Sequence, residues 1–131
     1  MYTTEPNLML GMARAQFELG QAAEARATLD ALIKANPKFR SPEGHLLYAR
    51  AVEACGDDDA ALQEFDAVSQ GYPGEEARVR YAQLLRKVGR GTQATELLRD
   101  VIKRASLAPK YYQREQREWV DLAKRTLQEL T

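Results

Sequence analysis

Few side chains in this sequence are of a type that does catalytic chemistry. His45 is the single histidine and Cys55 the single cysteine. His45 falls at a helical spacing that expects a packing residue, so a structural role is favoured over a catalytic one. Cys55 precedes the acidic residues 57–59, and acidic neighbours disfavour the thiolate that a nucleophile requires. We therefore expect no catalytic residue and no enzyme.

Metal and phosphate sites are not expected either. Asp57, Asp58 and Asp59 are consecutive and lack the spacing of a calcium-binding EF-hand loop. Three acids fit the start of a helix, where the helix dipole favours negative charge. The Gly-Arg-Gly run at 89–91 has no strand before it, so it does not predict a phosphate-binding loop. The sequence predicts no metal and no cofactor.

Composition is that of an ordinary globular chain, and the charge is unevenly distributed. The 131 residues are 44% hydrophobic and 29% charged, with zero net charge. Residues 1–74 carry six basic and eleven acidic side chains, net −5; residues 75–131 carry thirteen and eight, net +5. The basic side chains alternate with acidic ones and no aromatic stacking module accompanies them, so nucleic acid is not an expected partner. Two halves of opposite net charge would instead orient a protein partner or a second copy of the chain.

Compartment signals are sparse. No apolar run is long enough to span a membrane, and residues 1–10 lack the pattern of a signal peptide. A single cysteine excludes an internal disulfide and fits a reducing compartment.

The stretch 41–73 reads as one complete helical hairpin. Ser41 is suited to cap a helix and Pro42 to its first turn. Gly56 ends that helix, and a second helix with an apolar face runs to Gly71 and Pro73. The same landmarks recur on both sides: Gly20 to Gly56 spans 36 positions, and Gly56 to Gly89 spans 33. Helix-turn-helix units with a period in the mid-thirties predict an all-α fold, an α-solenoid.

The landmark residues resemble the tetratricopeptide repeat family. That pattern has a small residue in the first helix, a glycine at the turn and a small residue early in the second helix. A bulky residue follows four positions later, and a proline ends the repeat. The matching residues are Ala13, Gly20, Ala25, Leu29 and Pro37; Ala49, Gly56, Ala61, Phe65 and Pro73; and Ala82, Gly89, Ala94 and Leu98, with Ser106 in place of proline. The resemblance implies close helix crossings at the pairs Ala13/Ala25, Ala49/Ala61 and Ala82/Ala94.

We thus expect one domain over residues 1–131, with three hairpins at about 6–37, 42–73 and 75–106. Thr4 is the expected cap of the first helix. From Pro109 to Leu130 one uninterrupted amphipathic helix is expected to cover the last hairpin, with Trp119 on its apolar stripe. The first hairpin has no such cover, so Leu8, Met9, Met12 and Leu19 are expected to form an exposed apolar patch.

In the family, the first helix of each repeat lines a groove that binds a partner peptide or helix. The groove positions carry over to Asn7, Leu10, Arg14 and Phe17; to Leu46, Arg50 and Glu53; and to Val79, Arg80, Gln83 and Arg86. The family members that clamp a terminal carboxylate use Lys and Asn where this chain has Leu10 and Arg14, so that clamp is not predicted. Arginines flanked by apolar residues favour a peptide with acidic and apolar side chains, because arginine binds carboxylates bidentately. The opposing interpretation is that these arginines are solvated or pair with Glu18 and Glu53.

Two functions follow from the sequence. The first is a non-catalytic scaffold that binds a protein or peptide partner in the groove, and the alternative is a module for homo-oligomerisation of a larger protein. The segments at 41–51, 72–82 and 111–125 also resemble bacterial repeat proteins that follow an N-terminal membrane anchor. That resemblance implies a cytoplasmic domain tethered to the inner membrane, with membrane contact only through a segment upstream of this sequence.

Overall fold

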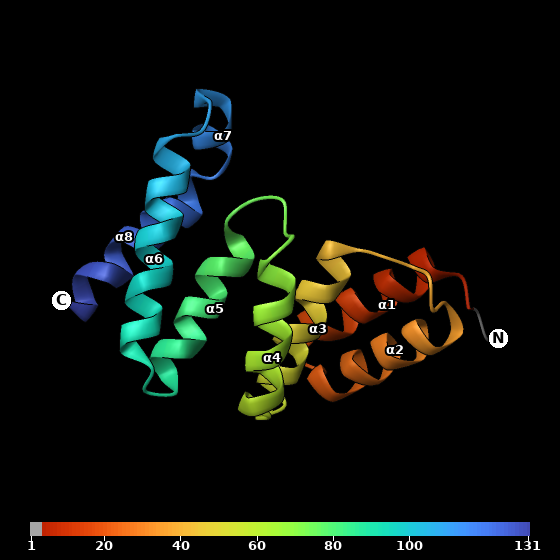
Figure 1. Ribbon diagram of the computed structural model, residues 1–131. Coiled ribbons are helices and arrows are strands. Elements are labelled where there is room, and N and C mark those ends of the chain that lie inside the picture. Colours follow the sequence, from red (N-terminus) through yellow and green to blue (C-terminus); the bar gives the residue numbers. More distant parts are fainter. Residues whose placement is uncertain (1–3) are drawn as a thin grey trace. The chain divides into compact units, whose positions relative to one another are not determined.

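The computed structural model describes residues 4–131, and these form an all-α fold. Its helices are, in order, α1 (Pro6–Glu18), α2 (Ala22–Ala35), α3 (Pro42–Ala54), α4 (Asp58–Ser69), α5 (Glu76–Lys87), α6 (Gly91–Ser106), α7 (Lys110–Glu115) and α8 (Arg117–Leu130) (Figure 1). No helix among the described residues is long and apolar enough to cross a membrane. The chain divides into two compact units, Met1–Glu64 and Phe65–Thr131, and the division falls inside α4.

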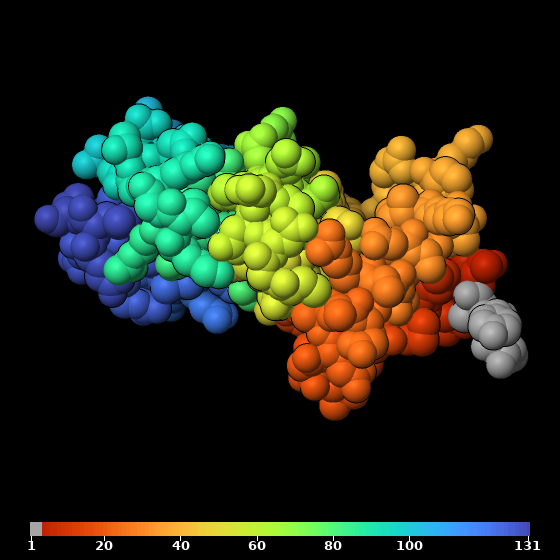
Figure 2. All heavy atoms as spheres, turned by 90° about the horizontal axis from the view of Figure 1, so that it is seen from below, coloured from red at the N-terminus to blue at the C-terminus, as the bar shows by residue number. Residues whose placement is uncertain are grey.

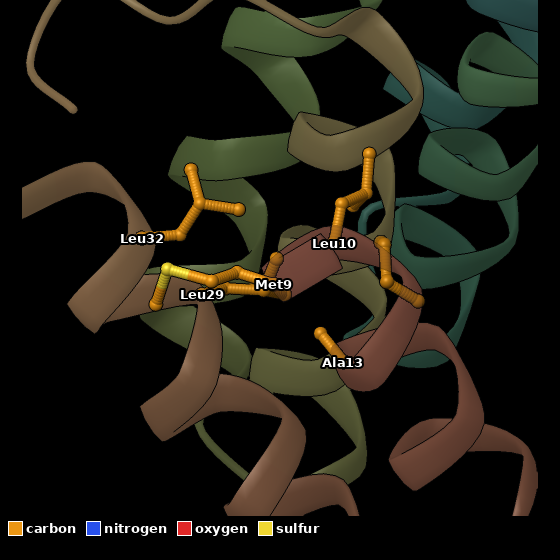
Figure 3. Close-up of a cluster of buried hydrophobic side chains, with 6 residues drawn as sticks. Met9, Leu10, Ala13, Leu29 and Leu32 are labelled. Carbon is orange, nitrogen blue, oxygen red and sulfur yellow. The ribbon is translucent and has the colours of Figure 1, made fainter. Parts of the chain in front are cut away.

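The first unit is organised around the packing of α1 with α2 and of α3 against both. One side of α1 carries Met9, Leu10 and Ala13 into an apolar cluster with Leu29 and Leu32 of α2, and Leu47 of α3 completes it (Figure 3). In the space-filling view the orange atoms of α2 cover much of α1, whose red atoms show at the edge (Figure 2). Burial of this stripe is what holds the hairpin together, because short isolated helices are marginal in water.

Three glycines close the turns at which the sequence predicted hairpins. Gly20, Gly56 and Gly89 have φ values of 81°, 86° and 85°, a left-handed conformation that costs a residue with a Cβ. After each glycine, the next residue's N–H reaches back to a carbonyl of the preceding helix, as Gln21 N to Gln16 O does at 2.9 Å. This is the Schellman pattern of a helix C-terminus. The expected turn positions are confirmed.

The six alanines of the three expected helix crossings have no exposed surface. They are Ala13, Ala25, Ala49, Ala61, Ala82 and Ala94. Within the units, α1 packs on α2 and α5 packs on α6. Small side chains let such helices approach closely, and larger ones would overpack the contact.

The start of α1 differs from the expectation. The cap is Glu5 and not Thr4: the Glu5 carboxylate accepts from Asn7 N at 3.1 Å and from Leu8 N at 2.9 Å. These backbone bonds favour the carboxylate and lower the pKa of Glu5 below its ordinary value. Pro6 follows as the first helical residue. Thr4 contributes its carbonyl, which accepts from the Asn36 side chain at 2.8 Å.

In the second unit, α5 and α6 form a hairpin, and α8 packs on both of them. The uninterrupted helix expected from Pro109 to Leu130 is wrong, since α7 and α8 are separated at Gln116. The break coincides with a long-range bond: the Gln116 side chain turns away to accept from Glu75 N at 2.8 Å. Gly74 makes room for it, because a Cβ there would lie 2.9 Å from Gln116 Oε1.

A buried carboxylate lies at this junction. Glu75 has no exposed surface and accepts a short hydrogen bond from the Tyr112 hydroxyl. Its other oxygen, Oε1, has no hydrogen bond but lies 3.7 Å from Arg78 Nη1, which also donates to Gly74 O at 2.5 Å. Burial, reinforced by the hydrogen bond to Glu75, raises the pKa of Tyr112 to about 12. The cluster ties α7 to the start of α5.

Candidate functional site

Two of the predicted groove residues meet on the face formed by α1 and α3. The guanidinium carbon of Arg50 lies 4.8 Å from the centroid of the Phe17 ring, and both side chains are half-buried. Such a cation–π contact attracts the cation to the ring face and restricts the orientation of the guanidinium. Helix α3 can present Arg50 here because Ser41 Oγ caps it, accepting from Gly44 N at 2.9 Å.

Arg14 lies on the same pair of helices and forms an exposed ion pair. Its Nη2 is 3.6 Å from Glu43 Oε2, and the two side chains are 47% and 74% exposed. Exposed pairs of this kind contribute about 0–1 kcal/mol. The pair with Glu43 is therefore a weak one. The sequence-based interpretation named Glu18 and Glu53 as pairing candidates and missed Glu43, whose position on the next repeat is visible only in three dimensions.

The remaining predicted residues of the first unit divide by burial. Leu10 and Leu46 are buried, 8% and 4% exposed, so they belong to the core and do not form a contact surface. Asn7 is exposed, and its side chain donates to Glu5 Oε1 at 3.3 Å. Glu53 is half-buried. The accessible part of the predicted set in this unit is thus polar, with Phe17 as its aromatic member.

In the second unit, helix α8 contacts the predicted groove residues of α5. Arg80 lies over the ring of Trp119 at 5.0 Å and pairs with Glu76 at 2.8 Å. Val79 has no exposed surface. Trp119, expected on the covering stripe, is half-buried by this contact.

Two more contacts continue along the same helices. Gln83 Nε2 donates to Thr126 Oγ1 at 2.7 Å, and Arg86 Nη1 lies 2.5 Å from Glu129 Oε1. The order of the partners along α8 follows the order along α5, so the two helices run in parallel. This is the relation of α3 to α1, in which Glu43 and Arg50 follow the order of Arg14 and Phe17. Helix α8 therefore lies on α5 as the first helix of a fourth hairpin would. It contacts the α5 side chains that were predicted to face a partner.

The two side chains that the sequence analysis considered for catalysis are His45 and Cys55. His45 Nε2 lies 2.9 Å from Glu64 Oε1, and both residues are half-buried. Cys55 is exposed at the end of α3. Within residues 4–131 no group of three or more His, Cys, Asp or Glu side chains is arranged to hold a metal ion.

Comparisons with known proteins agree with this architecture. Residues 1–51 match the model of the tetratricopeptide repeat family. No curated protein sequence matches the chain. In fold, the chain is similar to PcrH from Pseudomonas aeruginosa, with a TM-score of 0.81 and 13% identity over 99% of this chain and 94% of that one.

Two other solved structures are similar to nearly the same extent. The Yersinia enterocolitica type III secretion translocator chaperone SycD has a TM-score of 0.78 at 14% identity, over 99% of this chain and 86% of that one. PcrH in complex with the chaperone-binding region of PopD gives 0.78 at 14%, over 95% and 89%. Residues 1–51 are thus similar to the tetratricopeptide repeat family, and the turn glycines and buried alanines recur at corresponding positions in the rest of the chain.

Proposed function

We propose that the chain is a single non-catalytic interaction domain that binds a segment of a partner protein on the α1–α3 face. The observation that carries this proposal is the Phe17–Arg50 stack beside Arg14. A stacked arginine is held in place, so it loses less side-chain freedom when it binds a carboxylate. Two arginines and an aromatic ring on one face fit a segment with acidic and apolar side chains.

The structural relatives support a binding role in general terms. PcrH has been crystallised with the chaperone-binding region of PopD, so this fold is able to hold a segment of another protein. In the second unit, α8 already engages Arg80, Gln83 and Arg86. The proposed binding surface is therefore limited to the first unit, and its accessible residues are Asn7, Arg14, Phe17, Arg50 and Glu53.

A displayed peptide library provides the test. Peptides selected on the wild-type chain should be enriched in Asp or Glu together with Leu, Ile or Phe. A labelled selected peptide, followed by fluorescence anisotropy, should bind Arg14→Glu/Arg50→Glu at least tenfold more weakly, because each reversal replaces an attraction with a repulsion. Helicity measured by circular dichroism should be unchanged.

The matched control is Lys34→Glu/Lys38→Glu, which changes the net charge by the same amount. Lys34 lies on α2 and Lys38 just after it. This control should retain the affinity within about twofold, as expected for charges away from the interface. Equal affinity of the arginine variant and wild type would overturn the proposed face, as would selection of peptides without acidic residues.

Self-assembly is the second candidate, favoured by one specific observation. Leu8 and Met12 are exposed on α1, Leu19 just after it and Ile33 on α2, whereas Met9, expected in the same patch, is buried. An exposed apolar stripe of this kind is typical of a helix that packs on another surface. Light scattering over a range of protein concentrations tests self-assembly. Leu8→Gln/Met12→Gln should abolish any dimer. A wild-type chain that stays monomeric at all concentrations would exclude self-assembly.

We infer that the domain works in the cytoplasm, tethered to the inner membrane as part of a longer protein. The exposed free thiol of Cys55 fits a reducing compartment, and the resemblance to membrane-anchored repeat proteins supports the tether. Fractionation of the full-length gene product in bacterial cells would test this location, and its appearance in the periplasm would contradict it.

A further inference from the structure

The positive charge of the second unit is concentrated at one corner. Residues 103–117, which we call the basic corner, carry five basic side chains and one acidic one. The rest of 65–131 carries eight of each sign, so the net +4 of this unit lies entirely in fifteen residues. The basic residues are Lys103, Arg104, Lys110, Arg114 and Arg117. Of these, Arg104 pairs with Asp100 in the preceding turn of α6.

The basic corner also exposes apolar surface. Leu107 is 78% exposed and Tyr111 is 60% exposed, and in 65–131 they are the large hydrophobic side chains that stand in solvent. They flank the turn between α6 and α7, which lies at the end of α6 opposite the α5–α6 turn (Figure 1). Exposed leucine next to several lysines and arginines is unlike the rest of this unit, where the large apolar residues are covered.

Local hydrogen bonds fix the turn that carries these two side chains. Gln113 Nε2 donates to Ala108 O at 2.9 Å and to Ser106 O at 3.4 Å, which fixes the turn against the end of α6. Tyr112 is anchored inward by its hydroxyl on Glu75. The adjacent Tyr111 stays exposed in this fixed turn.

We propose that the basic corner docks on an anionic membrane surface. The lysines and arginines face lipid phosphates and carboxylates, while Leu107 and Tyr111 enter the interfacial layer. Tyrosine, with an apolar ring and a polar tip, is enriched at such interfaces. A nucleic acid would satisfy the positive charges but leave Leu107 in water, so the bilayer is the better match. This contact is distinct from the upstream anchor expected from the sequence, and it uses none of the α1–α3 residues.

Flotation with lipid vesicles tests the proposal. The wild-type chain should float with vesicles of phosphatidylcholine and phosphatidylserine and not with phosphatidylcholine alone, and salt should weaken the binding. Each basic residue near an anionic surface is worth about fivefold in affinity, so Lys103→Ala/Lys110→Ala should bind roughly thirtyfold more weakly. Leu107→Gln should also weaken binding while leaving its salt dependence unchanged, because it removes apolar contact only.

The matched control is Lys124→Ala/Arg125→Ala, which removes the same charge from exposed positions of α8 outside the basic corner. It should bind within about twofold of wild type. Equal loss in the control and the corner variant would overturn the proposal, because the effect would then be one of net charge. Capture of polyglutamate or RNA without flotation on anionic vesicles would also overturn it, and would assign the corner to an acidic polymer. All variants should be confirmed as folded by circular dichroism.

Discussion

Arg50 of α3 holds its guanidinium over the Phe17 ring of α1, with 4.8 Å between the guanidinium carbon and the ring centroid. The contact joins two successive hairpins at the proposed binding face, so it should stabilise the fold as well as orient the charge. We expect Phe17→Leu and Arg50→Met each to lower the free energy of unfolding. In a double-mutant cycle the coupling should be about 0.5–1 kcal/mol, the usual range for a partly exposed cation–π pair. Urea denaturation measures it, and additive effects of the two changes would show that the contact contributes nothing.

The turn glycines offer a test of backbone conformation alone. A Cβ at Gly56 would meet nothing within 4 Å, yet its φ of 86° is left-handed. Gly56→Ala should therefore destabilise the chain by about 1–2 kcal/mol through backbone strain. Gly11 is the matched control, since it also has open space around it but lies within α1. Gly11→Ala should stabilise by about 0.4–1 kcal/mol. Opposite signs in thermal denaturation are the expected result, and destabilisation by both would contradict it.

The buried hydrogen bond from Tyr112 to Glu75 should be visible in the dependence of stability on pH. The pKa of Tyr112 is raised from 10 to about 12, so the folded state holds the hydroxyl proton more tightly than the unfolded state does. The stabilisation is fully present below pH 10 and is lost as the pH rises toward 12.

Tyr112→Phe supplies the comparison. Below pH 10 it should cost about 1–3 kcal/mol, because the buried Glu75 oxygen loses its donor. The difference between wild type and variant should shrink between pH 10 and 12, as measured by chemical denaturation at each pH. A difference that stays constant across this window would show that Tyr112 acts through packing and not through its proton.

The buried alanines should tolerate no increase in size. Ala82 has no exposed surface on α5, which packs against α6. Ala82→Leu should destabilise by about 1–3 kcal/mol, because the helices must separate to admit the side chain. Ala67 is exposed on α4 and supplies the control: Ala67→Leu should change stability by less than about 0.5 kcal/mol. Urea denaturation of both variants makes the comparison, and equal stabilities would show that the crossing is not tightly packed.

The hairpins were predictable because their signals are local. A glycine at each turn and an alanine at each crossing are read directly from the sequence, and Gly20, Gly56 and Gly89 have the conformation that the pattern requires. The break at Gln116 was not predictable in this way. It coincides with a hydrogen bond from Glu75, 41 positions earlier, and the spacing of the apolar residues in α7 and α8 does not indicate that bond.

The candidate site was predictable only in part, for a similar reason. The resemblance to the tetratricopeptide repeat family assigned Phe17 and Arg50, which are in contact, to the same surface. It does not indicate what covers that face. Leu10 is in the core, and Arg86 is engaged by Glu129, and both facts depend on contacts between helices distant in sequence.

The three left-handed glycines also bear on where hairpins can be inserted or exchanged. Each hairpin closes with the same turn, and the connections at 36–41 and 70–75 have equal length. The change of period from 36 to 33 residues therefore lies in the helices, because α4 and α5 have 12 residues each where α2 has 14 and α3 has 13. The first connection is a natural point for insertion or for exchange of whole hairpins. The second carries Gly74 and Glu75, which contact Tyr112 of α7 and Gln116 at the α7–α8 break, so a graft there must bring its own terminal helices with it.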